Sequence, residues 1–475
     1  MSNKKSFLAH FMTIGLGTLI NMILGLITTP VLTRVVDPTE YGQLSMFTTY
    51  TSIAVMILCL GLDQALVRFY YDKDDLNYKR TLLRFCVMVP FLIATLGSVI
   101  IIIISLMRGV LLNFKPIIIV FLCINVVTTL WNRISLLVLR LEYDSRKYAI
   151  SNVIHRLSYL IISVGLIFIV KDNYFLILVN ATWLSLFLSS LYAVLCQKNL
   201  WTLKGNERLQ IREILKYSLP IILSMGLTTI FQACDKLSIK HYCTYADVGI
   251  YSSALTIVSV FAIIQTTFNT LWSPVMIEHL VKAPEDKSFI EKGNKYITII
   301  MFTFGLCLIF GKDVFTLLLG EKYREAASIM PFLIFNPIMY TISETTQCGI
   351  EYSKKSYHNI TISLVACITN IIGNTVLVPL IGSKGAAIST GLSYIIFFVM
   401  RTVISNRYYK VNFQLWKIAI MIIATSAFAY LNTFYQFSFM TVVGFIVCIL
   451  LLLLLYLEDV KSLARYVSDE VRKIL

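Results

Sequence analysis

The stretch TPVLTRVVDPTEYG, residues 29–42, separates two long apolar segments of the chain. It is short, yet it carries Arg34, Asp37 and Glu40 ahead of Gly42. Asp37 can cap a helix, and an acid in the first helical turn complements the helix dipole. The stretch therefore predicts a tight polar turn that ends one apolar helix and starts the next.

The composition around this turn is that of a membrane protein. Of the 475 residues, 57% are hydrophobic and 14% are charged, whereas about 25% of the residues of a soluble protein are charged. Apolar runs of roughly 20 residues recur along the chain, and each is long enough to cross the hydrocarbon core of a bilayer. The strands of a membrane barrel would instead show short alternating segments. The chain is therefore expected to be all-α and polytopic.

Hydropathy predicts fourteen transmembrane helices. The first lacks a cleavage site for a signal peptidase and is interpreted as a span. The even number places both termini on the same side of the membrane. The predicted spans are 7–28, 41–62, 82–107, 116–139, 149–170, 174–197, 214–234, 249–272, 296–318, 326–348, 359–379, 385–404, 413–432 and 438–457.

Lysine and arginine predict the orientation. With the N-terminus in the cytoplasm, the inner segments and their flanks carry 29 of these residues and the outer turns carry 10. This asymmetry follows the positive-inside rule. It also accounts for the net charge of +15, so that nucleic acid is not an expected partner.

A motif similar to the turn at 29–42 occurs at 240–256, KHYCTYADVGIYSSALT. When Gly42 is aligned with Gly249, both copies read acid-x-Gly-x-x-Ser-x-x-x-Thr, and they open spans two and eight. An even number of spans separates the copies, which predicts two parallel repeats. The expected domains are an N-lobe of six helices, a cytoplasmic linker, a C-lobe of six helices, two additional helices and an amphipathic tail, at 1–197, 198–213, 214–404, 405–457 and 458–475.

Six stretches resemble the polysaccharide or O-antigen (Wzx-type) flippases of the multidrug/oligosaccharidyl-lipid/polysaccharide (MOP) exporter superfamily. They occur in the order expected for that family and extend over nearly the whole chain. They are TPVLTRVVDPTEYG (29–42), GLDQALVRFYYD (61–72), SLPIILSMGL (218–227), DKLSIKHYCTYADVGIYSSAL (235–255), LLLGEKYREAASIM (317–330) and VPLIGSKGAAISTGLSY (378–394).

The resemblance implies a MATE-like fold of two six-helix lobes plus two C-terminal helices. It implies that the protein translocates an undecaprenyl-pyrophosphate-linked oligosaccharide across the bacterial inner membrane by alternating access, for O-antigen, capsule or exopolysaccharide synthesis. The expected partners are this lipid-linked oligosaccharide, membrane lipid, and the polymerase and chain-length proteins of polysaccharide assembly. No cofactor, metal or catalytic residue is expected.

The chemistry of such a substrate points to polar residues inside the spans. Each sugar hydroxyl that is buried without a partner costs roughly 2–7 kcal/mol, and a diphosphate is bound well by arginine. Arg133 and Arg156, in spans four and five, are candidates for substrate binding. The alternative for both is a long side chain that reaches back to the inner interface.

Further candidates for substrate contact lie at span ends or are uncharged. Arg68 and Lys236 could meet the diphosphate. The alternative is local pairing. Arg68 would then pair with Asp63 or a loop acid, and Lys236 with Asp235. For the neutral side chains, hydrogen bonding between helices is the alternative. These are Asn21, Gln265 and Asn269.

A second set is predicted to serve gating or coupling. Arg34 and Lys240 occupy similar places in the two repeats and could gate the outer mouth, or simply hold their short turns. Glu344 follows PFLIFNP, 331–337, whose two prolines predict a bend, and is a candidate for a carboxylate linked to protons or sodium. The full set is Arg34, Asp63, Asp235, Lys240, Glu344 and Gln347.

The remaining functional alternatives come from two classes. Among transporters, a cation-coupled multidrug exporter would favour an aromatic, carboxylate-lined cavity, and a flippase for lipid II, the peptidoglycan precursor, would favour more arginines. A membrane glycan polymerase commonly needs a large outer loop, and the predicted outer turns are short. No phosphate-cradling loop with a lysine is present, which argues against an ATP-driven enzyme.

Overall fold

The computed structural model describes residues 23–170, 173–202, 205 and 207–462. Apart from one 3-10 turn, the regular elements in these ranges are α-helices, and none of the described residues forms a strand. Helices satisfy their own backbone hydrogen bonds, which is what a segment in lipid requires. The predicted all-α class is confirmed.

Within the described residues, the number of apolar helices agrees roughly with the predicted number of spans. Ten are long and apolar enough to cross a membrane, and two further spans are pairs of helices with a sharp bend between them. Two shorter apolar helices, Ile23–Val35 and Phe439–Leu455, bring the apolar segments to fourteen. Most of the first predicted span, 7–28, lies outside the described residues, as does most of the predicted amphipathic tail, 458–475.

The chain forms two compact units. Unit 1 holds residues 1–32 and 39–233, and unit 2 holds residues 33–38 and 234–475. One helix, α8 (Ile211–Tyr242), contributes to both units. The predicted domain boundaries divide the chain between whole spans, with a linker at 198–213. They remain a prediction.

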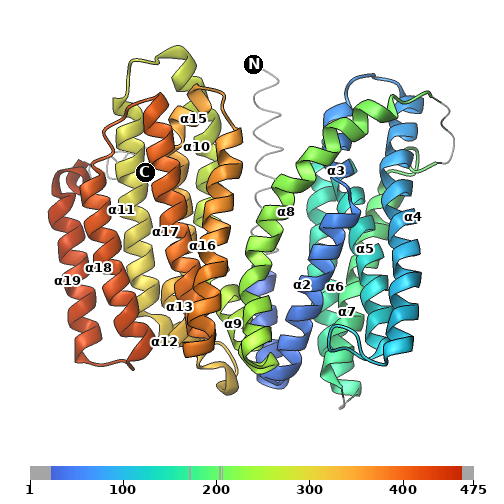
Figure 1. Cartoon of the computed structure of the whole chain (residues 1–475), viewed down its shortest axis with the longest axis horizontal. Helices are drawn as coiled ribbons and strands as arrows, with labels where there is room; N and C mark the ends of the chain where they lie inside the picture. Colours follow the sequence, from blue (N-terminus) through green and yellow to red (C-terminus); the bar gives the residue numbers. More distant parts are fainter. Residues whose placement is uncertain (1–22, 171–172, 203–204, 206, 463–475) are drawn as a thin grey trace, which may run out of the picture. The chain divides into compact units, whose positions relative to one another are not determined.

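Unit 1 is a bundle whose helices run in blue to green in Figure 1. In it α4 packs on α5, α5 on α7, and α6 on α7. Its elements are α2 (Pro38–Leu58), α3 (Leu62–Phe69), α4 (Leu76–Arg108), α5 (Pro116–Leu141), α6 (Ser145–Ile169), α7 (Tyr174–Cys196) and the first part of α8.

Unit 1 contains the first sharply bent span. The axes of α2 and α3 meet at 52°, and Gly61 between them has φ +67°. A Cβ at Gly61 would lie 2.5 Å from the carbonyl oxygen of Ser218 on α8. Glycine is therefore required here both for the backbone angle and for the close approach of α8.

Unit 2 contains the second bent span, α9 and α10, with 48° between the axes. Its most extensive packing joins α16 to α17, and α14 also packs on α17. The elements are α9 (Tyr245–Ser259), α10 (Ala262–Lys282), α11 (Ser288–Phe310), α12 (Lys312–Thr316), η1 (Glu321–Tyr323), α13 (Ala326–Leu333), α14 (Phe335–Thr346), α15 (Cys348–Tyr352), α16 (Tyr357–Ile381), α17 (Ser383–Tyr408), α18 (Leu415–Phe434) and α19 (Phe439–Leu455).

The PFLIFNP segment contains a one-residue break between two helices, but these helices together form one span that is not among the sharply bent ones. Helix α13 ends at Leu333 and α14 begins at Phe335. Proline lacks a backbone donor and crowds the preceding turn, so that each proline removes one hydrogen bond of the span, while the Ile334 and Ile338 N–H groups still donate to Met330 and Ile334. The following helix, α14, then carries Glu344.

The charged turn within residues 29–42 belongs largely to unit 2. The backbone N–H of Gly320 donates to the Thr33 hydroxyl over 3.1 Å, and the Tyr323 hydroxyl donates to the carbonyl of Val36 over 2.9 Å. Asp37 pairs with Lys322. The charge of the turn is thus explained in part by contacts with the segment around η1, which is another of the six family-like stretches.

The two similar motifs also start their helices at equivalent positions. Helix α2 begins four residues before Gly42, and α9 begins four residues before Gly249. Thr244 caps α9, since its hydroxyl accepts from the Asp247 N–H and the Asp247 carboxylate accepts from the Thr244 N–H. Both motifs open the spans that bend, which supports their interpretation as repeats.

Candidate functional site

A polar cavity lies inside unit 1, among α2, α3, α5 and α8. Its volume is about 320 Å³. Both hydrogen-bonding groups and small apolar groups line it, and the residues that line it in the described structure include no aromatic side chain. They are Ser52, Val55, Met56, Cys59, Gly61, Asp63, Thr129, Asn132, Arg133, Ile222, Met225, Thr229 and Gln232.

Arg133 supplies the cation of this cavity. Its Nη2 lies 2.5 Å from Oδ2 of Asp63, and its Nε donates to the same oxygen over 3.0 Å. The Arg133 side chain keeps 37% of its surface exposed, whereas the Asp63 side chain keeps 4%. Oδ1 of Asp63 is buried and accepts no hydrogen bond from any described residue. The guanidinium is thus accessible from the cavity, while its carboxylate partner is held behind it.

Of the two local pairings expected for Arg68, with Asp63 or with a loop acid, the structure shows the second. Asp63 and Arg68 do not pair with each other, because a separation of five residues points them to different faces of α3. Arg68 instead forms an exposed ion pair with Asp72 over 3.0 Å. Asp63 meets Arg133 because α3 packs against α5. The structure therefore brings two of the predicted site residues together and leaves Arg68 outside the cavity lining.

A second polar cluster surrounds Asp235 in unit 2. The hydroxyls of Tyr251 and Thr390 donate to Oδ2 of Asp235, each over 2.5 Å. The amides of Asn370 and Asn374 donate to Oδ1 over 3.0 and 2.8 Å. Helices α8, α9, α16 and α17 thus each contribute to one buried carboxylate.

All four of these donors are neutral. No ion pair joins Asp235 to a cation among the described residues, although Lys236 is its neighbour in sequence. Adjacent helical positions do not face each other, which explains why Lys236 does not neutralise it. Oδ1 of Asn374 is also buried without a hydrogen-bond donor in the described structure. The cluster therefore holds a buried carboxylate through neutral donors, without an ion-pair partner among the described residues, and such a carboxylate within a span is a candidate for proton or cation coupling.

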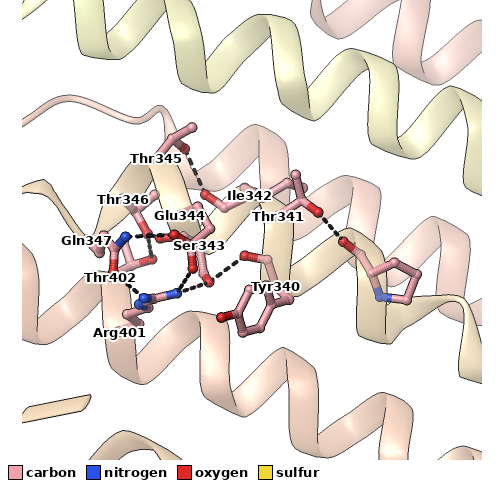
Figure 2. A network of polar contacts seen from close by, with 11 residues as sticks. Tyr340, Thr341, Ile342, Ser343, Glu344, Thr345, Thr346, Gln347, Arg401 and Thr402 are labelled. Atoms are coloured by element: carbon pink, nitrogen blue, oxygen red, sulfur yellow. Dashed lines mark hydrogen bonds and ion pairs between the residues drawn. The ribbon is translucent and has the colours of Figure 1, made fainter. Parts of the chain in front are cut away.

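Glu344, the other carboxylate predicted for coupling, lies in a different setting (Figure 2). Arg401 donates through Nη1 to Oε1 of Glu344 over 2.8 Å and to the Ser343 hydroxyl over 2.9 Å. Gln347 accepts from Arg401 and donates to Oε2 of Glu344 over 2.7 Å. Both ionic side chains are less than a tenth exposed. Glu344 therefore already has a cation, supplied by the protein.

Two aromatic rings also contact the guanidinium group of Arg401. The guanidinium carbon of Arg401 lies 5.7 Å from the centre of the Tyr340 ring and 5.4 Å from that of Phe397. Such cation–π contacts add to the stabilisation of a buried cation. The network joins α14 to α17 inside unit 2 and is best explained as a fixed internal charge pair.

The other predicted residues are dispersed. Arg34 is exposed, and Lys240 is half-buried with its amine 3.8 Å from the centre of the Tyr245 ring. Arg156 is exposed and does not line the cavity around Arg133. Gln265 and Asn269 are half-buried on α10, and Asn21 lies outside the described residues.

Sequence reasoning missed several residues of these clusters. Arg401 lies near the end of a predicted span and therefore resembles the basic residues that flank the inner face. Tyr251 and Thr390 carry no charge and resemble ordinary helix residues. The signal that could have identified Thr390 is its place in VPLIGSKGAAISTGLSY, the family-like stretch after span eleven.

Comparisons with known proteins show the family through a sequence profile and the fold through solved structures. The sequence profile of a family described as polysaccharide biosynthesis protein matches residues 7–280, more than half of the chain. A comparison with curated proteins gives no match.

Two solved structures illustrate the fold. A structure of the lipid II flippase MurJ in an inward closed conformation is similar with a TM-score of 0.70 and 16% identity, over 96% of this chain and 99% of that chain. An inward-facing multidrug resistance MATE family transporter of the MOP superfamily is similar with a TM-score of 0.58 and 14% identity, over 86% and 96% of the two chains. The predicted MATE-like architecture is confirmed.

Proposed function

This chain belongs to the polysaccharide biosynthesis protein family, and we propose that it is a flippase for an undecaprenyl-pyrophosphate-linked oligosaccharide repeat unit. In this proposal it moves the headgroup across the bacterial inner membrane by alternating access, with both termini in the cytoplasm. The product supplies the synthesis of O-antigen, capsule or exopolysaccharide. The observation that carries the proposal is the polar cavity with the accessible guanidinium of Arg133.

The cavity suits the part of the substrate that is hardest to move. A diphosphate and its first sugar need hydrogen bonds and a cation while they are away from bulk water. A volume of about 320 Å³ is at the small end of ligand sites. We infer that the cavity receives the diphosphate and the adjoining sugar, while the remaining sugars occupy water and the polyprenyl tail stays in lipid.

Asp63 gives the cavity a way to release this anion. The carboxylate already pairs with Arg133, so that an incoming diphosphate competes with it for the same guanidinium. Competition lowers the affinity for the headgroup below that of an unpaired arginine. A transporter needs such moderate binding, because a headgroup that is held too tightly leaves slowly.

Two energy sources are open to the transport cycle. An inside-negative membrane potential favours outward movement of an anion by about 2.3 kcal/mol per charge per 100 mV. We further propose that Asp235 carries the coupling proton or sodium ion, because it is buried without a cationic partner. Glu344 is less suited to this role, since Arg401 compensates its charge.

A lipid II flippase is the second candidate, and the fold shared with MurJ favours it. The headgroup of lipid II is also a diphosphate-linked saccharide, so the cavity does not separate the two substrates. A multidrug exporter is less well supported, because the described lining of the cavity carries no aromatic ring.

Deletion of the gene in a cell that makes a surface polysaccharide tests the proposal. We expect lipid-linked repeat units to accumulate on the cytoplasmic face, where a lectin added to intact spheroplasts does not reach them. Expression of the chain should restore surface labelling. Normal surface labelling in the deletion strain, with no other flippase gene present, would contradict the proposal. Loss of peptidoglycan synthesis with intact polysaccharide would favour lipid II.

A further inference from the structure

A second hollow lies on unit 1, where the start of α4 meets the segment that leads into α8. Its volume is about 260 Å³. The lining includes Thr81, Arg84, Phe85, Met88, Leu209 and Ile211, and also the acid Glu207. We call it the α4 groove. It shares no lining residue with the cavity around Arg133, and the proposed transport mechanism does not use it.

The α4 groove has a polar end and an apolar end. Thr81 and Arg84 lie one turn before Phe85 and Met88 on α4. Arg84 is also the last charged residue before a charge-free run of α4, residues 85–107, which is long enough to cross the hydrocarbon core. The groove therefore extends across the boundary between the headgroup layer and the hydrocarbon, on the side predicted to face the cytoplasm.

The segment opposite α4 in the groove is held by contacts from α4 and from the residues just before it. Arg84 donates to the carbonyl of Gly205 over 2.9 Å, and Arg80 donates to the carbonyl of Asn199 over 2.7 Å. Lys73 pairs with Glu207 over 2.8 Å, and this hydrogen bond raises the pKa of the Lys73 amine. The segment around Leu209 is thus fastened to α4, and the groove is a built feature of unit 1.

An apolar stripe continues from the groove along α4. Met88, Leu92 and Leu96 follow each other at intervals of four residues, and between 57% and 64% of each is exposed. Side chains at this spacing lie on one face of a helix. An acyl chain that entered the apolar end of the groove would therefore find a continuous track along the helix.

The charge around the groove is positive. The lining itself carries one charge of each sign, Arg84 and Glu207, whereas the neighbouring segments, residues 73–84 and 198–216, carry nine lysines and arginines against four acids. Basic residues at the cytoplasmic end of a span attract anionic lipid headgroups. The guanidinium of Arg84 can bind a phosphate with paired hydrogen bonds.

We propose that the α4 groove binds one anionic phospholipid of the membrane. Arg84 contacts the phosphate, and one acyl chain lies against Met88 and the stripe beyond it. The bound lipid joins α4 to the connection that enters α8, the helix shared by both units. Membrane lipid thereby stabilises the start of α8. This inference is independent of which lipid-linked sugar the protein transports.

Native mass spectrometry of the purified full-length chain tests this. We expect the first phosphatidylglycerol to bind about tenfold more tightly than phosphatidylcholine. Both lipids present a phosphate to Arg84, but the choline ammonium of phosphatidylcholine cancels its net charge and is repelled by the basic residues around the groove. Arg84→Gln should remove most of that difference. Met88→Trp keeps the charge, fills the apolar end and should weaken both lipids. Arg108→Gln, at the other end of α4, is the matched control and should leave binding unchanged.

Three results would overturn the proposal. The first is equal affinity for the two phospholipids, or affinity for phosphatidylglycerol that survives both groove variants. The second is displacement of the bound lipid by an equal concentration of inorganic pyrophosphate, which would identify a simple anion site. The third is tighter, Arg84-dependent binding of undecaprenyl phosphate, which would assign the groove to the transported class of lipid. Thermal unfolding of the variants controls for a loss of fold.

Discussion

At the scale of single residues, Arg133 is the side chain on which the proposed transport depends most. It holds Asp63 in the structure, and in our proposal it exchanges this carboxylate for the diphosphate of the substrate. This exchange predicts opposite changes in substrate affinity when Arg133 and Asp63 are substituted.

Arg133→Gln should weaken the binding of a diphosphate-linked oligosaccharide by about 10-fold to 100-fold, because a hydrogen bond to a charged group contributes about 1.5–3 kcal/mol. Asp63→Asn should instead tighten binding, since it frees the guanidinium from a competitor. Affinity measured with the chain in nanodiscs checks both. Weaker binding in Asp63→Asn, with an unchanged melting temperature, would argue against the exchange.

Asp235→Asn tests the proposed coupling site. The substitution removes the buried charge but keeps the size of the side chain, so that a proton or sodium ion has nothing to compensate. We expect the transport rate to lose its response to an imposed proton or sodium gradient, while the response to membrane potential remains. Rates in liposomes with each gradient applied separately provide the measurement. A gradient response of normal size in Asp235→Asn would exclude this carboxylate.

Glu344 and Arg401 should act on stability as a pair. Glu344→Gln leaves a buried guanidinium without its carboxylate and should destabilise the protein by about 3–5 kcal/mol. The double variant Glu344→Gln with Arg401→Met removes both charges and should recover much of this loss. Thermal unfolding in detergent follows the effect. The single variants Glu344→Gln and Arg401→Met are the reference. If the double variant loses as much stability as these two lose together, the pair is not coupled.

At the scale of elements, the break between α2 and α3 shapes the cavity. Gly61 lines the cavity, and its backbone lies against Ser218 of α8. Because φ is positive there, a side chain is strained even without a clash.

Gly61→Ala should destabilise unit 1 by about 1–2 kcal/mol from the backbone angle alone, with a further loss from displacing α8. Gly97→Ala on α4 is the matched control, because a Cβ at Gly97 meets nothing within 4 Å. Melting temperatures of the two variants give the comparison. Equal melting temperatures would contradict both the backbone strain at Gly61 and the close approach of α8.

Most elements could be predicted from the sequence because hydropathy is a local property. A run of about 20 apolar residues identifies a span wherever it packs, and the prolines of PFLIFNP indicate an interruption. The 52° bend after α2 could not be predicted in the same way. Gly61 allows that bend, but only the packing of α8 against it makes the bend necessary.

The same distinction explains the outcome at the candidate site. Arg133 could be singled out because a charge within an apolar run is visible locally. Its partner could not be identified, because Asp63 is 70 residues away in sequence and meets it only through helix packing. Arg401 looks like a flanking residue in the sequence, and its burial against Glu344 is a tertiary property.

At the scale of the whole molecule, two features join the units through the chain itself. Helix α8 belongs to both, and residues 33–38 belong to unit 2 while the segments on either side belong to unit 1. The charged turn is fastened within unit 2 by Gly320, Tyr323 and Lys322. In the proposed cycle these connections carry a change in one unit to the other.

The central claim is that this chain moves a diphosphate-linked sugar headgroup across a bilayer with the help of Arg133. The most direct test is the translocation of a fluorescent undecaprenyl-pyrophosphate oligosaccharide in proteoliposomes, measured by access of an external glycosidase. We predict rapid translocation by the wild-type chain, at least roughly tenfold slower translocation by Arg133→Gln, and an unchanged rate for Arg108→Gln at the end of α4. Translocation by Arg133→Gln at the wild-type rate, or none by the folded wild-type chain under any gradient, would contradict the claim.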